Sequence, residues 1–499
     1  MSGFGHLDRS TVDALHDAGL ASARSLGASE ASVRVEEIRA QYLVLRDGQV
    51  ETSIDQTIEG VGVRTIRDGS VGFAATVDLR PEAVVEATEQ AVLAARLVGP
   101  ARTGSFDLVD EPGHGEVEWT SPYRIDPTEV PTAEKVALLA AWSEQLLSAK
   151  GVTHVTARVL AVREVKQYAD TNGTIARQHR VRLHPAFEIL AVADDGDFET
   201  MRTIAPPVGR GWEYLLGEGW DFEAELAQMP ELVVEKLRSP SIDPGRYDLV
   251  LDPTNLWLTI HESIGHATEL DRALGYEAAY AGTSFATPDQ LGTLQYGSSV
   301  MQVTGDRTAE HGLATIAIDD EGVEGQQFDL IRDGVLVGYQ LDRATAAVAG
   351  YARSNGCAFA DSPLHLPIQR MANVSLAPAP EGPSTEQLIS GVDRGLYVVG
   401  DKSWSIDMQR YNFQFTGQRF YRIEQGRIVG QVRDAAYQAT TTDFWGAMEA
   451  VGGPQTYLLC GAFNCGKAQP GQVAAVSHGA PSVLVRQVNL LNARAEAGQ

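Results

Sequence analysis

Turn dipeptides between alternating apolar runs are the feature that most limits the folds open to this chain. Four such pairs precede residue 205: Asp47-Gly48, Asp68-Gly69, Asn172-Gly173 and Asp195-Gly196. Asx-Gly pairs tolerate the positive φ angles of tight hairpin turns, so each pair predicts two antiparallel strands joined by a short turn. We therefore expect β-meanders over about residues 31–75 and 152–204.

Helical periodicity brackets these meanders and defines the predicted organisation. Apolar residues recur at helical spacing over about residues 10–26, 81–97, 132–151 and 222–237. A stretch rich in Gly, Pro, Asp and Glu, about residues 99–131, is expected to be a linker. A second break, Ser239-Pro240 to Pro244-Gly245, precedes many short strands joined by turns. We predict an α+β protein with an N-terminal helix/β-meander domain (residues 1–239) and a strand-rich, barrel- or sandwich-like C-terminal domain (residues 240–499).

Charge and cysteine content exclude several classes of function. The 499 residues carry a net charge of −26, which argues against binding of a nucleic-acid backbone. The N-terminus has no basic segment followed by an apolar run, so neither a signal peptide nor a membrane span is expected. Only three cysteines are present, and we expect no disulfide framework and a cytoplasmic location.

A buried helix is predicted immediately after the second break. Asp252 is a plausible N-cap, and Pro253 occupies the first helical position, where its missing N–H costs nothing. Leu256, Ile260 and Ile264 then recur every fourth residue and form a core-facing stripe. This helix is expected to hold the residues at its end rigidly.

The end of this helix carries two imidazoles and one carboxylate, in the order His261-Glu262-Ser263-Ile264-Gly265-His266. In the familiar H-E-x-x-H zinc motif the histidines are four residues apart, but here they are five apart, as H-E-x-x-x-H. On an ideal α-helix that spacing separates them by about 140°, too far for one ion. Both can face one metal only if the turn widens, as in a π-bulge, or breaks, and Gly265 is a natural place for such a change. The alternative interpretation is two unrelated helix histidines.

A catalytic zinc ion usually has three protein ligands and one water. Cys465 is the candidate for the third ligand, because the neighbouring Lys467 would favour its thiolate. Glu269 is the alternative, followed by His311 and His365. The other two cysteines, Cys357 and Cys460, are interpreted as small buried hydrophobic residues.

At this point the chain resembles the TldD/PmbA family, and specifically its metal-carrying TldD-type branch. The matching pieces run over nearly the whole length: Arg46-Asp47-Gly48-Gln49-Val50-Glu51, Gly60-Val61-Gly62-Val63-Arg64, Gly72-Phe73-Ala74, the hexapeptide with Glu269 and Asp271, Gly282-Thr283-Ser284, Asp319-Asp320-Glu321-Gly322, Arg370-Met371-Ala372-Asn373 and Cys465-Gly466-Lys467. No single piece is specific, and their order and coverage carry the match.

The resemblance implies a zinc metallopeptidase whose Zn²⁺ ligands are His261, His266 and Cys465, with Glu262 as the general base. It also implies a dimer, either of two identical chains or with a related PmbA/TldE-type subunit, acting on unfolded or leader-type peptides. A non-catalytic partner subunit and a structural zinc protein are the rival interpretations. A scaffold need not keep His261, Glu262, His266 and Cys465 together, and Glu262→Gln, which should keep zinc and lose cleavage, distinguishes the enzyme from a structural zinc protein.

Overall fold

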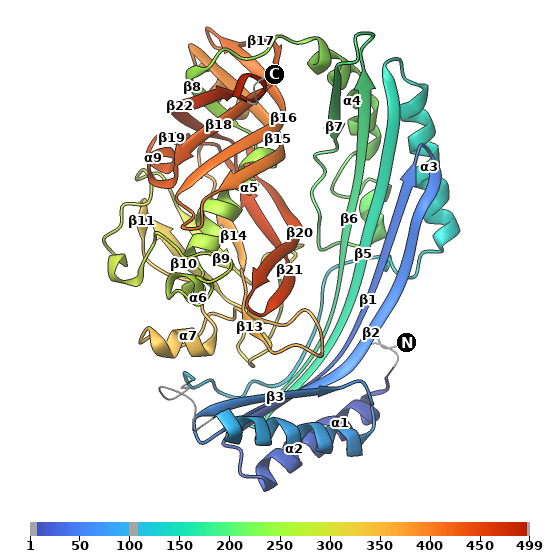
Figure 1. Cartoon of the computed structure of the whole chain (residues 1–499), viewed down its shortest axis with the longest axis vertical. Helices are drawn as coiled ribbons and strands as arrows, with labels where there is room; N and C mark the ends of the chain where they lie inside the picture. Colours follow the sequence, from blue (N-terminus) through green and yellow to red (C-terminus); the bar gives the residue numbers. More distant parts are fainter. Residues whose placement is uncertain (1–6, 99–107, 497–499) are drawn as a thin grey trace.

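The computed structural model describes residues 7–98 and 108–496. Its first half is built on one long, curved, mostly antiparallel sheet with the strand order β3-β2-β1-β5-β6-β4, and β7 pairs with β6 (Figure 1). The strands are β1 (Glu30–Arg46), β2 (Gln49–Arg67), β3 (Ser70–Thr76), β4 (Gly115–Thr120), β5 (Val152–Asp170), β6 (Thr174–Val192) and β7 (Phe198–Arg202). The hairpins predicted at the Asx-Gly pairs are confirmed. Both residues of Asp47-Gly48 have positive φ, at 50° and 76°.

Two features of this sheet differ from the prediction. The alternation of residues predicts two strands, 49–54 and 58–67, but residues 49–67 form one continuous strand of 19 residues, because β1 pairs with it along its whole length. The expected linker contains β4, which pairs in parallel with β6. The strand alternates apolar and polar residues too briefly to be recognised from the sequence. Residues 99–107 of that linker lie outside the described residues.

Two pairs of helices cover the sheet at its two ends (Figure 1). The helices α1 (Arg9–Ser25) and α2 (Pro81–Val98) pack on one end, around a core that includes Val33 and Val63. The helices α3 (Thr132–Ser148) and α4 (Phe222–Arg238) pack on the other end, around Leu139, Phe187 and Val233. The opposite face of the sheet is turned toward the second half of the chain (Figure 1).

The second half contains a closed β-barrel, so the predicted barrel-like domain is confirmed. Its strands follow the order β15-β8-β22-β18-β16, and pairing of β15 with β16 closes the ring. They are β8 (Gly245–Leu251), β15 (Arg394–Ile406), β16 (Asn412–Glu424), β18 (Ala435–Thr440) and β22 (Val483–Asn492), extended by β17 (Arg427–Val432) and β19 (Met448–Val451).

Smaller elements surround the barrel and complete the fold. One sheet has the order β11-β10-β9-β14, β12 pairs with β13, and β20 forms a hairpin with β21. These strands are β9 (Val303–Asp306), β10 (Gln327–Arg332), β11 (Val335–Leu336), β12 (Ala358–Phe359), β13 (Ile368–Gln369), β14 (Asn373–Leu376), β20 (Leu458–Ala468) and β21 (Gly471–Ala480). The helices are α5 (Pro253–Ile260), α6 (Leu270–Ala273), α7 (Arg343–Val348), α8 (Thr385–Ser390), α9 (Thr441–Gly446) and α10 (Ala493–Glu496).

The two sheet systems divide along the chain near residue 240. Every strand of the first sheet precedes the end of α4, and every strand of the barrel follows it. We propose this point as the domain boundary. Buried ion pairs join the halves: Lys166 Nζ lies 2.8 Å from Asp320 Oδ2, and Arg64 Nη2 lies 2.9 Å from Glu321 Oε1.

None of the helices in the described ranges has the length and apolar character that crossing a bilayer requires.

Candidate metal centre

The helix α5 connects the metal centre to the barrel. Its N-terminus is as predicted: the Asp252 carboxylate accepts from the Thr254 N–H at 3.0 Å, and Pro253 occupies the first turn. The Asn255 side-chain amide donates to the backbone carbonyls of Gly400 and Thr416, at 3.0 and 3.1 Å, on two barrel strands. Every residue of α5 is buried, so the helix is a rigid support for the turn that follows.

A π-turn follows α5 at His261–Gly265, which is the widening that the five-residue histidine spacing requires. The His266 N–H donates to the His261 carbonyl, an i to i+5 hydrogen bond. Gly265 itself has an ordinary helical φ of −52°, so its role is not backbone freedom. Glycine is required there by packing, because a Cβ atom would lie 2.6 Å from the sulfur of Met371.

Side chains satisfy the backbone carbonyls that the widened turn releases. The Gly265 carbonyl accepts from the Gln340 side-chain amide at 2.7 Å. The Ser263 carbonyl accepts from the Tyr296 hydroxyl. Since unpaired buried carbonyls are costly, these two side chains stabilise an otherwise unfavourable turn.

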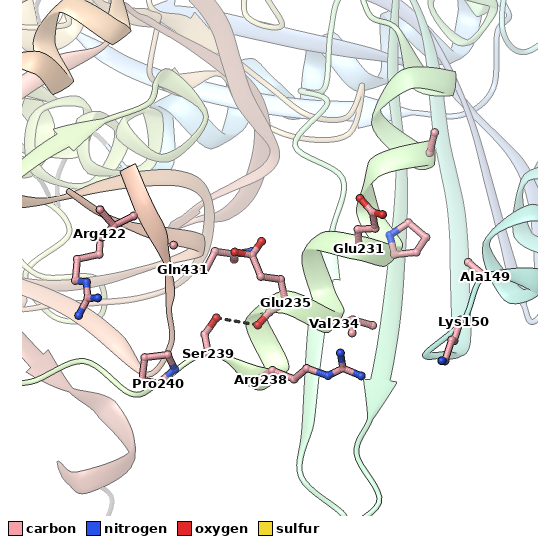
Figure 2. A pocket seen from close by; sticks show the side chains of 14 residues that line it. Ala149, Lys150, Glu231, Val234, Glu235, Arg238, Ser239, Pro240, Arg422 and Gln431 are labelled. Carbon is pink, nitrogen blue, oxygen red and sulfur yellow. Dashed lines mark hydrogen bonds between the residues drawn. The ribbon is translucent and has the colours of Figure 1, made fainter. Parts of the chain in front are cut away.

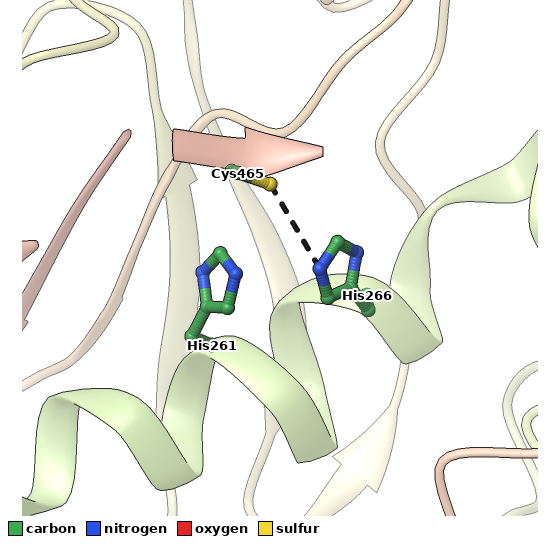
Figure 3. A group of neighbouring side chains, drawn as sticks. All are labelled: His261, His266 and Cys465. Atoms are coloured by element: carbon green, nitrogen blue, oxygen red, sulfur yellow. Dashed lines mark hydrogen bonds between the residues drawn. The ribbon is translucent and has the colours of Figure 1, made fainter. Parts of the chain in front are cut away.

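The turn brings both histidines to the same cysteine (Figure 3). The ligand atoms of His261, His266 and Cys465 all lie within 4.8 Å of one another, and all three residues are buried. The Cys465 Sγ atom lies 3.8 Å from His266 Nε2, near the separation of about 3.6 Å for two tetrahedral ligands of one zinc ion. The pairing register of β20 shifts between Ala462 and Cys465, and such an irregularity re-aims side chains beside a site.

Hydrogen bonds determine which nitrogen of His261 is free. The His478 Nδ1–H donates to the Val374 carbonyl at 2.9 Å, since a carbonyl only accepts. Burial holds the pKa of His478 well below its usual value, so this ring is neutral and its Nε2 accepts from His261 Nδ1–H at 2.7 Å. Burial lowers the pKa of His261 as well. Its Nε2 is therefore unprotonated, as a metal ligand must be.

His266 is oriented by a carboxylate in the same manner. Its Nδ1 lies 2.7 Å from Glu269 Oε2. Burial raises the pKa of Glu269, but Lys467 and His266 outweigh burial and hold the pKa well below the usual range. An ionised Glu269 accepts from His266 Nδ1–H, which leaves Nε2 facing Cys465. Such histidine–carboxylate pairs are typical of metal sites.

The alternative third ligands are engaged elsewhere. Glu269 bonds to the outer nitrogen of His266 and is not one of the three converging donors. His311 Nδ1 lies 3.2 Å from the Gly209 carbonyl, and His365 Nδ1 lies 2.6 Å from an Asp361 oxygen. The geometry thus singles out Cys465.

Two imidazoles and one thiol are a donor set that suits zinc. Burial raises the pKa of the Cys465 thiol, but His266 and the Arg370 guanidinium reverse this effect, so the pKa is lowered overall. Lys467 does not have the role expected from the sequence. Its ammonium group bonds to Asp271 and to Gln369, each at 2.7 Å.

A cavity of about 510 Å³ opens beside the three donors and lies between the two halves of the chain. Glu262 lines this cavity, and its Oε2 accepts from Arg410 Nη1 at 2.8 Å. A larger hollow of about 850 Å³, between α3, α4 and β17, shares no lining residue with the metal centre (Figure 2). The cavity beside the donors is therefore the one that a substrate of this site would enter.

His478 and Arg410 belong to the site but were not identified from the sequence. His478 lies 217 residues after its partner His261, and no local pattern joins the two. Its position within the apolar run of β21 is the one available signal, because a buried histidine needs hydrogen-bond partners.

Removing the His478 imidazole tests its role in holding His261. We expect His478→Ala to weaken zinc binding by about 10- to 100-fold, the usual cost of losing an outer partner of a metal ligand. Competition with a metal indicator measures this change. His16→Ala is the matched control, since His16 is equally buried but bonds to the Gln167 carbonyl, away from the metal centre. Equal zinc affinities of the two variants would contradict the assigned role.

Comparison with known proteins places the chain in a family. Residues 244–492 match the model of the "PmbA/TldA metallopeptidase C-terminal domain", and residues 31–95 match "PmbA/TldA metallopeptidase domain 1". The chain belongs to the TldD/PmbA family of metallopeptidases. Among similar proteins, a metalloprotease of Methanothermobacter thermautotrophicus is 27% identical over 91% of this chain and 94% of its own length. A zinc metalloprotease TldD homologue of Saccharolobus solfataricus is 26% identical over 61% of this chain and 64% of its own length.

Solved structures share the fold over almost the entire chain. A Thermotoga maritima protein described as a modulator of DNA gyrase superposes with a TM-score of 0.75 at 18% identity, covering 96% of this chain and 100% of its own. TldE from Thermococcus kodakarensis superposes with a TM-score of 0.68 at 17% identity, covering 96% and 99%. At these identities the likeness concerns the fold alone.

Proposed function

We propose that this chain is a zinc-dependent peptidase that hydrolyses peptide bonds in unfolded or leader-type peptides. His261, His266 and Cys465 would hold the ion, and Glu262 would be the general base. The observation that carries the proposal is the convergence of three buried donors beside a cavity that Glu262 also lines. A relative named as a zinc metalloprotease supports the choice of metal.

Each residue of the site has a specific role in this proposal. When bound, zinc supplies a Lewis acid that lowers the pKa of a coordinated water to about 7 and polarises a carbonyl. Glu262 takes the proton from the attacking water and passes it to the leaving amine. Arg410 holds the Glu262 carboxylate in place through the 2.8 Å ion pair. His478 and Glu269 hold the two imidazoles with Nε2 toward the cysteine.

The number of donors favours catalysis over a structural zinc site. Structural sites are closed by four protein ligands, whereas catalytic sites keep one position open. Within the described ranges, the cluster contains His261, His266 and Cys465 and no fourth donor. The adjoining cavity offers the space that water and substrate need.

The same donors argue against a purely scaffolding subunit, because a scaffold has no need of two histidine ligands, a thiol ligand and a general base in one place.

We propose that the chain works as a dimer, either with a second copy or with a TldE-type subunit. The shared fold with TldE supports a related partner. Size measurement of the chain, alone and co-expressed with such a subunit, tests this assembly.

Metal removal tests the proposed function directly. We expect the purified chain or its dimer to contain one zinc ion per chain of this type and to cleave an unstructured peptide. Dialysis against a chelator should abolish cleavage, because no nucleophile activated by the metal remains, and added zinc should restore it. Zinc content by mass spectrometry and cleavage by chromatography are the measurements. Cleavage that persists in metal-free protein would overturn the proposal.

A further inference from the structure

The first sheet supplies the wall of the cavity opposite the metal donors. Cross-strand register aligns Tyr42 on β1, Leu160 on β5 and His184 on β6 in one row. Arg158 and Ala186 form the next row on the same face, and all five residues line the cavity. This wall comes entirely from the half of the chain that holds none of the metal donors.

An aromatic contact connects this wall to the metal-binding strand. The His184 ring stacks on Phe463, with ring centroids 5.7 Å apart and an angle of 25° between the planes. Phe463 precedes Cys465 by two residues on β20. A chemical group of a substrate that binds at this wall would therefore lie beside the part of the peptide that occupies the metal centre.

One positive charge that lines this cavity has no ion-pair partner among the described residues. Asp401 Oδ2 pairs with Arg202 Nη2 at 2.8 Å, and Glu262 pairs with Arg410 at 2.8 Å. Among the residues that the structure describes, the Arg158 side chain has no ion pair and no hydrogen bond. A half-buried guanidinium without a partner faces the cavity of a chain whose net charge is −26.

His184 adds a neutral hydrogen-bonding group beside this cation. Burial, together with the positive charges of Arg202 and Arg158, lowers the pKa of His184 to about 4. The ring is therefore uncharged at neutral pH, and one of its nitrogens carries a proton that it can donate. Arg158 and His184 together offer the several N–H donors of a guanidinium and one further N–H donor from the imidazole.

We propose that Arg158 and His184 bind a carboxylate group of the peptide substrate. The guanidinium presents its N–H donors in a planar fork that matches a carboxylate. The two carboxylates that line the cavity, Asp401 and Glu262, are each paired with a different arginine. The carboxylate can come from the substrate's C-terminus or from an Asp or Glu side chain near the cleaved bond. This inference rests on the proposed peptidase function and adds a preference to it.

Matched peptides test the preference on the zinc-loaded protein, alone and with its co-expressed partner. One unstructured sequence is prepared with a free C-terminus or a C-terminal amide, and with Asp or Asn near the cleaved bond. We expect kcat/KM to be roughly 10- to 100-fold higher for one of the two carboxylate forms, the range for one hydrogen bond to a charged group. The peptide pair that shows the difference identifies the source of the carboxylate.

Variants on the sheet then assign the effect to one residue. Arg158→Gln should bring the ratio of acid to neutral peptide close to one, and Arg158→Lys should leave an intermediate ratio, because it keeps the charge but loses the fork. Arg46→Gln is the matched control. It removes an arginine from β1 on the same sheet, outside the cavity, and should keep the parent's ratio.

The outcomes separate this inference from the proposed function. Equal cleavage of acid and neutral peptides by the parent, or an unchanged ratio in Arg158→Gln, would overturn the carboxylate site and leave the peptidase intact. Absence of cleavage for every peptide would count against the peptidase. In that case, fluorescence anisotropy of the same labelled peptides still tests carboxylate recognition, and equal affinities would overturn it.

Discussion

Replacing Glu262 by Gln is expected to lower kcat/KM for peptide cleavage by about 10²- to 10⁴-fold, the usual contribution of a general base. The amide has the same shape as the carboxylate but cannot take a proton from water. Its oxygen can still accept from Arg410, which lies 2.8 Å from Glu262 in the parent, so the local structure should persist. Zinc content should therefore stay at the parent's level.

Glu199→Gln is the matched control for this experiment. Glu199 is also a largely buried carboxylate paired with cations, Lys236 at 3.0 Å and Lys402 at 3.3 Å, but it lies outside the cavity. Its variant should cleave at close to the parent's rate. A Glu262→Gln enzyme that retains both zinc and the parent's rate would exclude Glu262 as the base and reopen the structural-zinc interpretation.

Replacing Cys465 by Ala is expected to abolish zinc binding and peptide cleavage together. The change removes one of three donors, so the loss of affinity should exceed the 10- to 100-fold that an outer partner costs. In the parent, zinc that binds only the folded state should raise stability by about 2.7 kcal/mol at 100 times its dissociation constant. This zinc-dependent rise in the unfolding temperature should disappear in Cys465→Ala.

Cys357→Ala provides the control for a buried thiol. Cys357 is fully buried and free, as Cys465 is, but it does not join the metal cluster. Its variant should lose some stability through the small cavity it creates and should keep the thermal response to zinc. A Cys465→Ala protein that binds zinc as tightly as Cys357→Ala would remove the thiol from the ligand set.

The fold could be predicted wherever the signal was local. Asx-Gly pairs located the hairpins of the first sheet, and the i to i+5 histidine spacing anticipated the π-turn at His261–Gly265. The continuity of β2 could not be predicted, because it depends on pairing with β1 along its whole length. The closure of the barrel through β15 and β16 likewise depends on tertiary pairing, although the strand-rich character of this half was visible.

The candidate site shows the same division between local and distant information. Cys465 was identified by its chemistry and by the family resemblance, although it lies 199 residues from His266. His478 and Arg410 were missed, because only the folded chain brings them to His261 and Glu262. Glu269 was considered as a ligand, yet a separation of three residues lets it reach the outer nitrogen of the same histidine.

The two walls of the cavity are formed by residues from different halves of the sequence. The three candidate ligands and Glu262 lie after residue 240, whereas Tyr42, Arg158 and His184 lie before it. If the chain is the peptidase proposed above, substitutions in the early strands will alter which peptides are cleaved and leave the candidate metal centre intact. Related proteins could thus differ in substrate preference through changes in the first half alone, while the sequence of the second half stays the same.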